Sequence, residues 1–219
     1  MSKIVYDYIE EYIRNLIPKE DDLLKELEEY ALLNNVPIIH PEVAQLLSFL
    51  IKVNKPLKIL EIGTAIGYSA IVMKKAALSG RIITIDRDSD MIKLAEENIK
   101  KAGFQDSIEI IEGDALDILT NMDKDFDFIF IDAAKGQYME FFPHCHRMLN
   151  NEGIIFADNV LFRGMVATNE LLIRRKITIV KRMRKYLKFI TENHDYETSI
   201  LPLGDGVAIS LKSGGLANE

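Results

Sequence analysis

The sequence predicts an α/β protein with a mostly parallel sheet, and three features of the chain indicate it. After Pro56, short apolar runs alternate with longer amphipathic segments, as in a parallel sheet with crossover helices. Glycines and acids directly follow several of these runs, at the strand ends where open α/β sheets bind ligands. Near the C-terminus, two strand-like runs flank Gly204-Asp205-Gly206, a turn pattern typical of an antiparallel hairpin at a sheet edge.

Three helices are expected before the sheet. Apolar residues recur at helical spacing over residues 4–17, 21–33 and 41–53. We therefore expect an N-terminal helical extension over residues 1–54, followed by an α/β core over residues 55–215.

The expected parallel strands are five apolar runs, namely LKILEIG, RIITIDRD, SIEIIEGD, FDFIFIDA and GIIFADNV. The segments between them have a helical period, which indicates five βα units. A long basic helix is expected over residues 172–191, with inward side chains at Ile173, Ile177, Val180, Met183, Leu187 and Ile190. The last two runs, YETSILPLG and DGVAISLKS, are the expected strands of the hairpin.

Length and composition favour a single domain over residues 1–219. A chain of 219 residues with 48% hydrophobic content can bury a sizeable core. Its one cysteine, Cys145, excludes an intramolecular disulfide, and the first residues lack the basic-then-apolar order of a signal peptide. No apolar run is long enough to span a bilayer. We expect a soluble cytoplasmic protein with no membrane partner.

Charge is distributed unevenly along the chain. The formal net charge of −7 argues against a nucleic-acid partner, because a polyanion repels an acidic protein unless positive charge is gathered locally. Between Arg163 and Lys188, however, nine basic residues accompany a single acid, Glu170. An outward stripe of Arg174, Lys181, Lys185 and Lys188 is expected on the basic helix. The sequence leaves two interpretations, an ordinary solvated face or a surface for a phosphate-rich partner.

The first strand ends in a glycine turn, EIGTAIGYS, with Gly63 and Gly67 four residues apart. Glycines at a strand-to-helix turn let the backbone approach a ligand closely. The turn is not a dinucleotide-binding G-x-G-x-x-G motif, and the chain contains no G-x-x-x-x-G-K-[ST] loop for a nucleoside triphosphate. Asp86 and Asp114 end the next two strands, where an acid can accept hydrogen bonds from ribose hydroxyls. A nucleoside-sized site without a basic phosphate cradle is predicted.

A structural role must be weighed for each acid at a strand end. Asp86, Asp114 and Asp132 could each be the N-cap of the following helix, a position that favours aspartate. Their coincidence with the glycine turn favours a ligand site over three separate caps.

The fourth and fifth strands end in oxygen-bearing side chains, Asp132 and the pair Asp158-Asn159. Adjacent parallel strands lie about 4.8 Å apart, so we expect these side chains to converge. Two carboxylates and an amide oxygen suit Mg²⁺ or Ca²⁺ and suit zinc poorly. Such an ion would lower the pKa of a bound hydroxyl, and Lys135 could take its proton or stabilise the oxyanion.

Taken together, these motifs resemble those of class I S-adenosylmethionine methyltransferases, which have a Rossmann-like, seven-stranded sheet with a terminal antiparallel hairpin. The Asp132-x-x-Lys135 motif followed by Asp158-Asn159 is similar to metal-dependent O-methyltransferases of the catechol and caffeoyl-coenzyme A type. This resemblance implies Asp132, Asp158 and Asn159 as metal ligands, with Lys135 and Asp132 catalytic. It implies that the cofactor-binding residues are Ile39, Glu61, Gly63, Ser69, Asp86, Asp114, Ala115 and Asp132. Many relatives carry Glu where this chain has Asp86, which shortens the reach to ribose.

A narrower resemblance covers nearly the whole chain. NVPIIHPEV, LKILEIGTAIGYSA, FIFIDAAKGQY, ADNVLFRGMV and LPLGDGVAIS resemble the bacterial tRNA 5-hydroxyuridine methyltransferases. This implies methyl transfer to the 5-hydroxyl of 5-hydroxyuridine in the anticodon region of tRNA, at the wobble position. Contacts to tRNA are then expected from Arg163, Arg174, Lys181 and Lys185.

Two alternatives stay open at this point. The same chemistry could act on a small catechol-like molecule, or the domain could bind RNA without catalysis. We interpret Val5, Tyr8 and Tyr12, which share one helix face, as helix packing or a homodimer contact. His40 and His194 are expected to be surface or cap residues.

Overall fold

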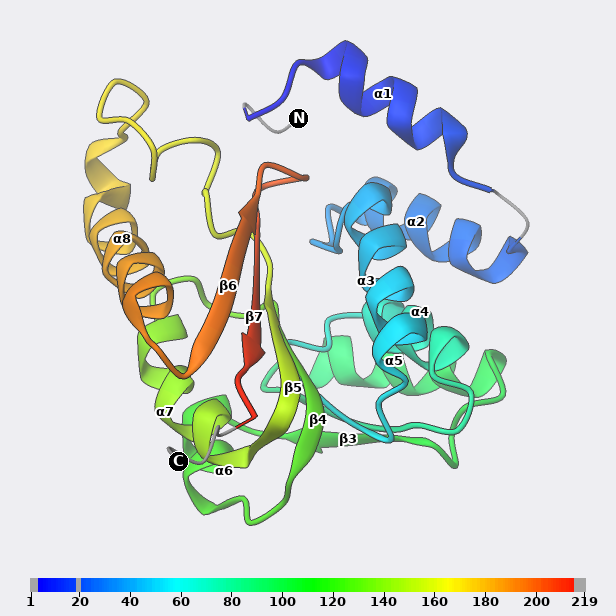
Figure 1. Cartoon of the computed structure of the whole chain (residues 1–219). Helices are drawn as coiled ribbons and strands as arrows, with labels where there is room; N and C mark the ends of the chain where they lie inside the picture. Colours follow the sequence, from blue (N-terminus) through cyan, green and yellow to red (C-terminus); the bar gives the residue numbers. More distant parts are fainter. Residues whose placement is uncertain (1–3, 19–20, 215–219) are drawn as a thin grey trace.

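One mixed sheet organises the computed structural model, which describes residues 4–18 and 21–214 (Figure 1). Within these residues seven strands pair in the order β3-β2-β1-β4-β5-β7-β6. The parallel strands are β1 (Lys58–Ile62), β2 (Arg81–Asp86), β3 (Ile108–Glu112), β4 (Phe126–Ile131) and β5 (Leu149–Ala157). The hairpin strands are β6 (Tyr196–Leu201) and β7 (Val207–Lys212), and β7 also pairs antiparallel with β5. The predicted fold class is confirmed.

The three predicted N-terminal helices are present as α1 (Asp7–Leu16), α2 (Asp22–Asn34) and α3 (Pro41–Asn54). The side chain of Asp21 caps α2 by accepting a hydrogen bond from the Leu24 amide. Helix α3 starts with proline at its first position, where a missing N–H costs nothing. Within the described residues, no helix is long and apolar enough to cross a membrane.

Helices cover both faces of the sheet (Figure 1). The face beside α3 is also covered by α4 (Tyr68–Ala76) and α5 (Ser89–Lys101), and the opposite face by α6 (Ala115–Asn121), α7 (Tyr138–Met148) and α8 (Ile177–Glu192). Alternate side chains of β4 enter the two cores: Phe128 and Phe130 pack on the α3 face, and Ile129 and Ile131 on the α7 face. A strand buried on both faces accounts for the apolar run FDFIFI.

Strand β5 begins earlier than the sequence indicated. We expected it to start at Gly153, but it starts at Leu149. Phe126 pairs with Leu149 while Phe128 pairs with Ile154, so β5 carries extra residues in a bulge. Because the residues in this bulge are polar, the start of β5 does not form an apolar run in the sequence.

The basic helix was predicted too long at its start. A 3₁₀ turn (Arg174–Lys176) precedes α8, and Ile173, expected to point inward, is 46% exposed. The neighbouring Leu172 instead packs against the small apolar cluster formed by Phe162, Met165 and Val180. That cluster gives the segment an apolar anchor without a further helical turn.

Tyr8 and Tyr12 of α1 do not enter either core of the described chain, although Tyr8 stacks on exposed Tyr6 with ring centroids 5.5 Å apart. Tyr8 and Tyr12 are both exposed, so the interpretation as helix packing inside this chain is wrong for them. A homodimer contact through this face stays a prediction.

Candidate active site

A cavity of about 840 Å³ lies beyond the carboxyl ends of the parallel strands. Most of the predicted site residues line it, namely Ile39, Gly63, Ser69, Asp86, Asp114, Ala115, Asp132, Lys135, Asn159 and Arg163. Glu61 and Asp158 are buried beside it and are not part of its surface. The structure thus gathers residues that end or follow all five parallel strands and a residue that precedes α3.

The glycine turn forms one wall of the cavity. Gly63 has a φ of +107°, and a Cβ atom there would lie 2.1 Å from the carbonyl oxygen of Asp132. No residue other than glycine fits between these two backbones. Gly67 is also left-handed, with a φ of +81°, and precedes α4. The turn therefore presents bare backbone to the cavity, as predicted.

The carboxylate of Asp86 accepts hydrogen bonds from the backbone of this turn. Its Oδ2 accepts hydrogen bonds from the amides of Thr64 and Ala65, both at 2.9 Å. Its Oδ1 accepts from the amides of Arg87 and Asp88 at 2.7 and 3.1 Å. These four bonds occupy the acceptor sites that a carboxylate offers. Asp86 is not the cap of α5, which is Asp88. Its predicted contact with ribose stays a prediction.

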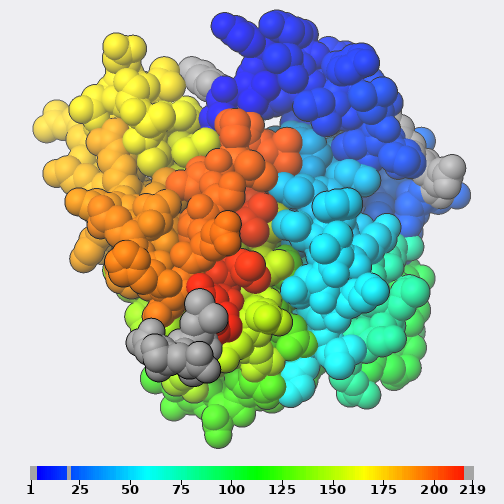
Figure 2. Space-filling view, viewed as in Figure 1, coloured from blue at the N-terminus to red at the C-terminus, as the bar shows by residue number. Residues whose placement is uncertain are grey.

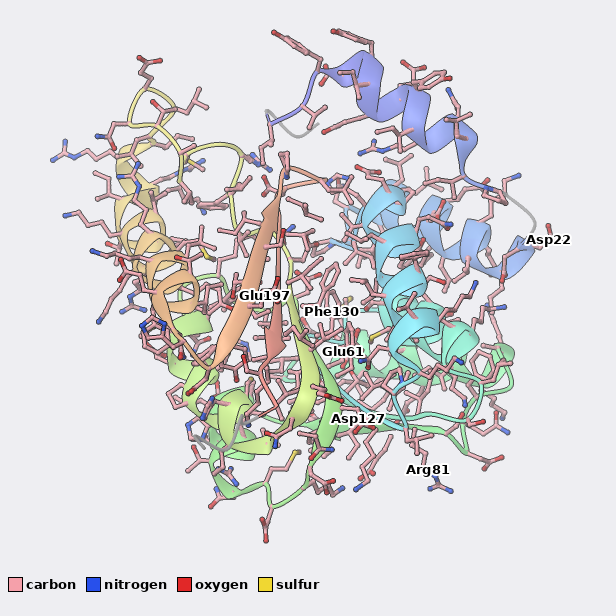
Figure 3. The ribbon with its side chains drawn as sticks, in the orientation of Figure 1. Asp22, Glu61, Arg81, Asp127, Phe130 and Glu197 are labelled. Atoms are coloured by element: carbon pink, nitrogen blue, oxygen red, sulfur yellow. The ribbon has the colours of Figure 1, made fainter. Side chains whose placement is uncertain are left out.

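Glu61 acts beneath the cavity surface, within the layer of the sheet (Figure 3). Its carboxyl group accepts a hydrogen bond from the Ser69 hydroxyl and another from Thr84 Oγ1 at 2.5 Å. Burial raises the pKa of Glu61 to about 8. Glu61 therefore holds Ser69 at the cavity wall, and its own predicted contact with a cofactor would have to pass through that serine.

Asp114 combines a cap with a place at the cavity. Its side chain accepts a hydrogen bond from the Leu116 amide at 2.9 Å and caps α6. Ala115, the first residue of α6, lines the cavity beside it. For this acid the capping role and the predicted ligand role are compatible.

Asp132 and Asp158 follow paired residues of β4 and β5, because Ile131 is in register with Ala157. Asp158 is only 1% exposed; its Oδ1 accepts from the Asn159 amide at 2.7 Å, and its Oδ2 is buried without a hydrogen-bond partner. Burial raises the pKa of both carboxyl groups, and the charge of Asp132 raises that of Asp158 further. Two acids placed in this way need a cation to be ionised together.

Lys135 supplies positive charge beside this pair. Its Nζ donates a hydrogen bond to Asn159 Oδ1 at 2.6 Å, and its charge lowers the pKa of both Asp132 and Asp158. Asn159 has a φ of +57°, a left-handed conformation that asparagine tolerates. The predicted convergence of Asp132, Asp158, Asn159 and Lys135 is present.

The chemistry of this donor set fits a hard divalent cation. The Oδ2 atom of Asp158 is buried without a hydrogen-bond partner, which costs folding free energy. A cation bound to this oxygen would remove that cost. Among the described residues, no group of three or more histidine, cysteine or acidic side chains is arranged to hold a metal. The fit therefore rests on two carboxylates and the amide of Asn159.

Comparison with known proteins agrees with this geometry. The family described as O-methyltransferase matches residues 15–213. A catechol O-methyltransferase from Niastella koreensis is 34% identical over 173 residues, covering 76% of this chain and 78% of the relative. The chain belongs to the O-methyltransferase family. A candidate caffeoyl-CoA O-methyltransferase from Staphylococcus aureus superposes with a TM-score of 0.88 at 35% identity, covering 94% of this chain and 100% of that structure. The SAH-bound methyltransferase PaMTH1 of Podospora anserina has a TM-score of 0.85 at 26% identity and covers 94% of each chain.

His40 and Asp205 are among the residues of this O-methyltransferase that line the cavity without having been predicted there. His40, expected at the surface or as a cap, precedes α3 and lines the cavity. Asp205, interpreted only as part of the hairpin turn, lines it too, and its carboxylate accepts a hydrogen bond from the Arg163 amide. Their position depends on how α3 and the hairpin tip pack, which local sequence patterns do not encode. An acid between two glycines in a tight turn was the one available signal.

The basic segment of the O-methyltransferase lies beside the cavity at Arg163 and extends along α8. Arg174, Lys181 and Lys185 are exposed, and among the described residues their side chains have no hydrogen bond or ion pair. Lys188, by contrast, lies 3.8 Å from Glu192. The predicted outward stripe is present, with Lys188 partly neutralised.

Proposed function

We propose that this O-methyltransferase transfers the methyl group of S-adenosylmethionine to the 5-hydroxyl of 5-hydroxyuridine in tRNA, with Mg²⁺ or another divalent cation at the site. The product would be 5-methoxyuridine at the wobble position. One observation supports the chemistry above all: the buried, unpartnered Oδ2 of Asp158 lies beneath a nucleoside-sized cavity that Asp132, Lys135 and Asn159 line.

The cavity wall suits the proposed cofactor. The glycine turn offers bare backbone, and Ser69, Asp114 and Ala115 line the wall around it. The Podospora relative was solved with S-adenosylhomocysteine, the demethylated form of this cofactor. A sulfonium cofactor carries no phosphate, in agreement with a turn that lacks a phosphate-binding motif.

Asp132, Asp158 and Asn159 are the residues that would hold the cation. When bound, a divalent ion would lower the pKa of a coordinated hydroxyl and orient two adjacent oxygens of the acceptor. Lys135, fixed by Asn159, is placed to stabilise the oxyanion while it is charged, or to receive the hydroxyl proton once it has lost its own. In the transfer, the acceptor O–CH₃ bond forms as the S–CH₃ bond breaks and leaves S-adenosylhomocysteine, and the hydroxyl proton passes to a neutral Lys135 or to solvent.

The basic surface supports a polyanionic acceptor. Arg163 at the cavity and the free side chains of Arg174, Lys181 and Lys185 provide positive charge on an otherwise acidic protein. Figure 2 shows the segment before α8 (yellow) and α1 (blue) on either side of the hairpin tip (orange). A small aromatic acceptor needs no such charge.

A second candidate acceptor is a small catechol-like molecule. The names of the Niastella and Staphylococcus relatives favour it, and a catechol offers the same adjacent oxygen pair as 5-hydroxyuridine. A non-catalytic RNA-binding role has less support, because such a domain needs neither Lys135 nor the buried acid pair.

The deciding experiment offers both acceptors to the purified protein with S-adenosylmethionine and Mg²⁺. We expect methylation of tRNA that contains unmethylated 5-hydroxyuridine, identified by nucleoside mass spectrometry. EDTA should abolish the transfer, and added Mg²⁺ should restore it. Transfer confined to a catechol would refute the tRNA proposal, and transfer that survives EDTA would refute the metal assignment.

A charge-reversal variant tests the basic surface separately. R174E/K181E/K185E should weaken tRNA binding and flatten its dependence on salt, because fewer counterions are released. The matched control is K52E/K55E/K100E, which reverses three exposed lysines elsewhere on the molecule. If both variants lose the same amount of binding, net charge alone accounts for the effect, and the proposed basic surface is refuted.

A further inference from the structure

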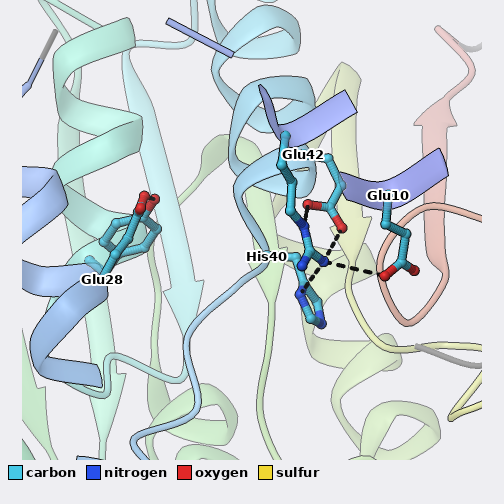
Figure 4. A network of polar contacts seen from close by, with 6 residues as sticks. Glu10, Glu28, His40 and Glu42 are labelled. Atoms are coloured by element: carbon cyan, nitrogen blue, oxygen red, sulfur yellow. Dashed lines mark hydrogen bonds and ion pairs between the residues drawn. The ribbon is translucent and has the colours of Figure 1, made fainter. Parts of the chain in front are cut away.

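Helix α1 reaches the active-site cavity through a polar cluster (Figure 4). The Arg14 guanidinium donates to both carboxylate oxygens of Glu42, with distances of 2.7 and 2.8 Å, and Glu10 lies 3.5 Å away. Arg14 Nη2 also lies 3.0 Å from His40 Nδ1. Glu10 and Glu42 are buried, so the cluster is a built part of the structure and not a surface ion pair.

The arginine fixes the state of the His40 ring. A guanidinium has only donors, so the Nδ1 atom that faces it must be an acceptor without a proton. The ring therefore carries its proton on Nε2, and this N–H has no partner among the side chains and backbone groups that the structure describes. A cavity-lining ring is thus left with one free donor.

His40 lines the cavity beside the tip of the β6–β7 hairpin. It contacts the hairpin tip, where a Cβ atom on Gly204 would come within 3.2 Å of the ring Cδ2. Asp205 follows Gly204 and lines the same cavity with Arg163. Asp132, of the candidate metal pair, lines this cavity as well. The free N–H of His40 thus belongs to a residue that lines the same cavity as Asp132, Asp205 and Arg163.

We propose that His40 binds the methyl acceptor by donating its Nε2–H to an acceptor oxygen, and that Arg14 is the positioning residue that holds the ring in this tautomer. The proposal rests on the proposed O-methyl transfer but not on the identity of the acceptor, because 5-hydroxyuridine and a catechol both offer oxygen lone pairs. Helix α1, outside the α/β core, would then be part of the acceptor site.

The test is steady-state kinetics of H40A, H40Q and R14M with whichever acceptor the wild-type protein methylates. H40A should raise KM for the acceptor about three- to tenfold, the usual effect of one lost hydrogen bond. Its kcat and its Kd for S-adenosylmethionine should change less than twofold. H40Q should have a KM for the acceptor close to that of the wild type, since the glutamine amide can accept a hydrogen bond from Arg14 and still donate one to the acceptor.

A double variant separates positioning from structure. If Arg14 acts through His40, R14M should raise KM for the acceptor, and R14M/H40A should be no worse than H40A alone. H194A, at an exposed histidine, is the matched control and should leave KM unchanged. An unchanged KM in H40A, or an equal rise in the Kd for S-adenosylmethionine, would overturn the proposal.

Transfer to a catechol alone would refute the tRNA assignment and still allow this test. Thermal unfolding of each variant shows whether a rise in KM accompanies a loss of stability. R14K keeps the positive charge beside Glu42, and it serves as the variant if R14M does not fold.

Discussion

Two pairs of acids stand at the same sheet edge and differ in how their oxygens are satisfied. Glu61 on β1 accepts hydrogen bonds from two side-chain hydroxyls, and Asp86 on β2 accepts hydrogen bonds from four backbone amides. Asp132 and Asp158, after β4 and β5, are less fully satisfied: Asp158 accepts from the Asn159 amide through Oδ1 but keeps a buried Oδ2 without a partner, and Asp132 makes no side-chain hydrogen bond among the described residues. The first pair shapes the cavity wall, and the second is free to meet a ligand.

The difference shows that burial alone does not identify a functional acid. Glu61 is more deeply buried than Asp132, yet its surroundings satisfy it. A buried acid with no partner costs stability unless something absent from the chain supplies the missing interaction. The satisfied pair should therefore tolerate different substitutions from the unsatisfied pair.

The largest effect is expected from D158N. Losing a carboxylate from the candidate metal site should lower the rate of methyl transfer about a thousandfold, or about 4 kcal/mol of transition-state stabilisation. The same change replaces a buried carboxyl group whose ionisation is opposed by burial and by the charge of Asp132. Without metal, D158N should thus melt at a higher temperature than the wild type, and Mg²⁺ should raise the melting temperature of the wild type only. Higher stability in the variant without any loss of activity would contradict the metal role.

A smaller effect is expected from D86N. An asparagine NH₂ cannot accept a hydrogen bond, so two of the four backbone amides around Asp86 would lose their acceptor. The glycine turn should loosen, raising the Kd for S-adenosylmethionine about tenfold, equivalent to about 1.4 kcal/mol. Calorimetry measures this, and metal-dependent stabilisation should stay intact. An unchanged Kd would show that the turn holds its shape without these bonds.

The smallest effect on activity is expected from E61Q. This substitution should instead change how the stability of the protein depends on pH. Burial raises the folded-state pKa of Glu61 from an ordinary 4.5 to about 8, so the unfolded chain releases this proton first as pH rises. The contribution of Glu61 to stability is therefore complete below about pH 4.5 and is lost as pH approaches 8. Glutamine does not titrate, so melting curves should favour E61Q over the wild type increasingly across this window. A constant difference between the two proteins would show that Glu61 is already ionised when folded.

The parts of the fold that follow local patterns were predictable from the sequence. Strand positions, the hairpin and the converging residues at β4 and β5 could be predicted because apolar periodicity and strand-end chemistry are local. The bulge in β5 and the short start of α8 were missed, because they depend on pairing with Phe126 and packing of Leu172. The place of His40 at the cavity depends on α1, through Arg14, and could not be deduced from residues near it.

The contact between Gly63 and the carbonyl of Asp132 fixes how far the cofactor turn stands from the start of the acid-bearing loop. Only a hydrogen atom separates the two backbones there, so that spacing is as rigid as the sheet itself. Residues at the rim of the cavity can be substituted without changing this contact between the two backbones. In this chain, the rim of the cavity can therefore select the acceptor while the spacing between the cofactor turn and the candidate metal acids is kept.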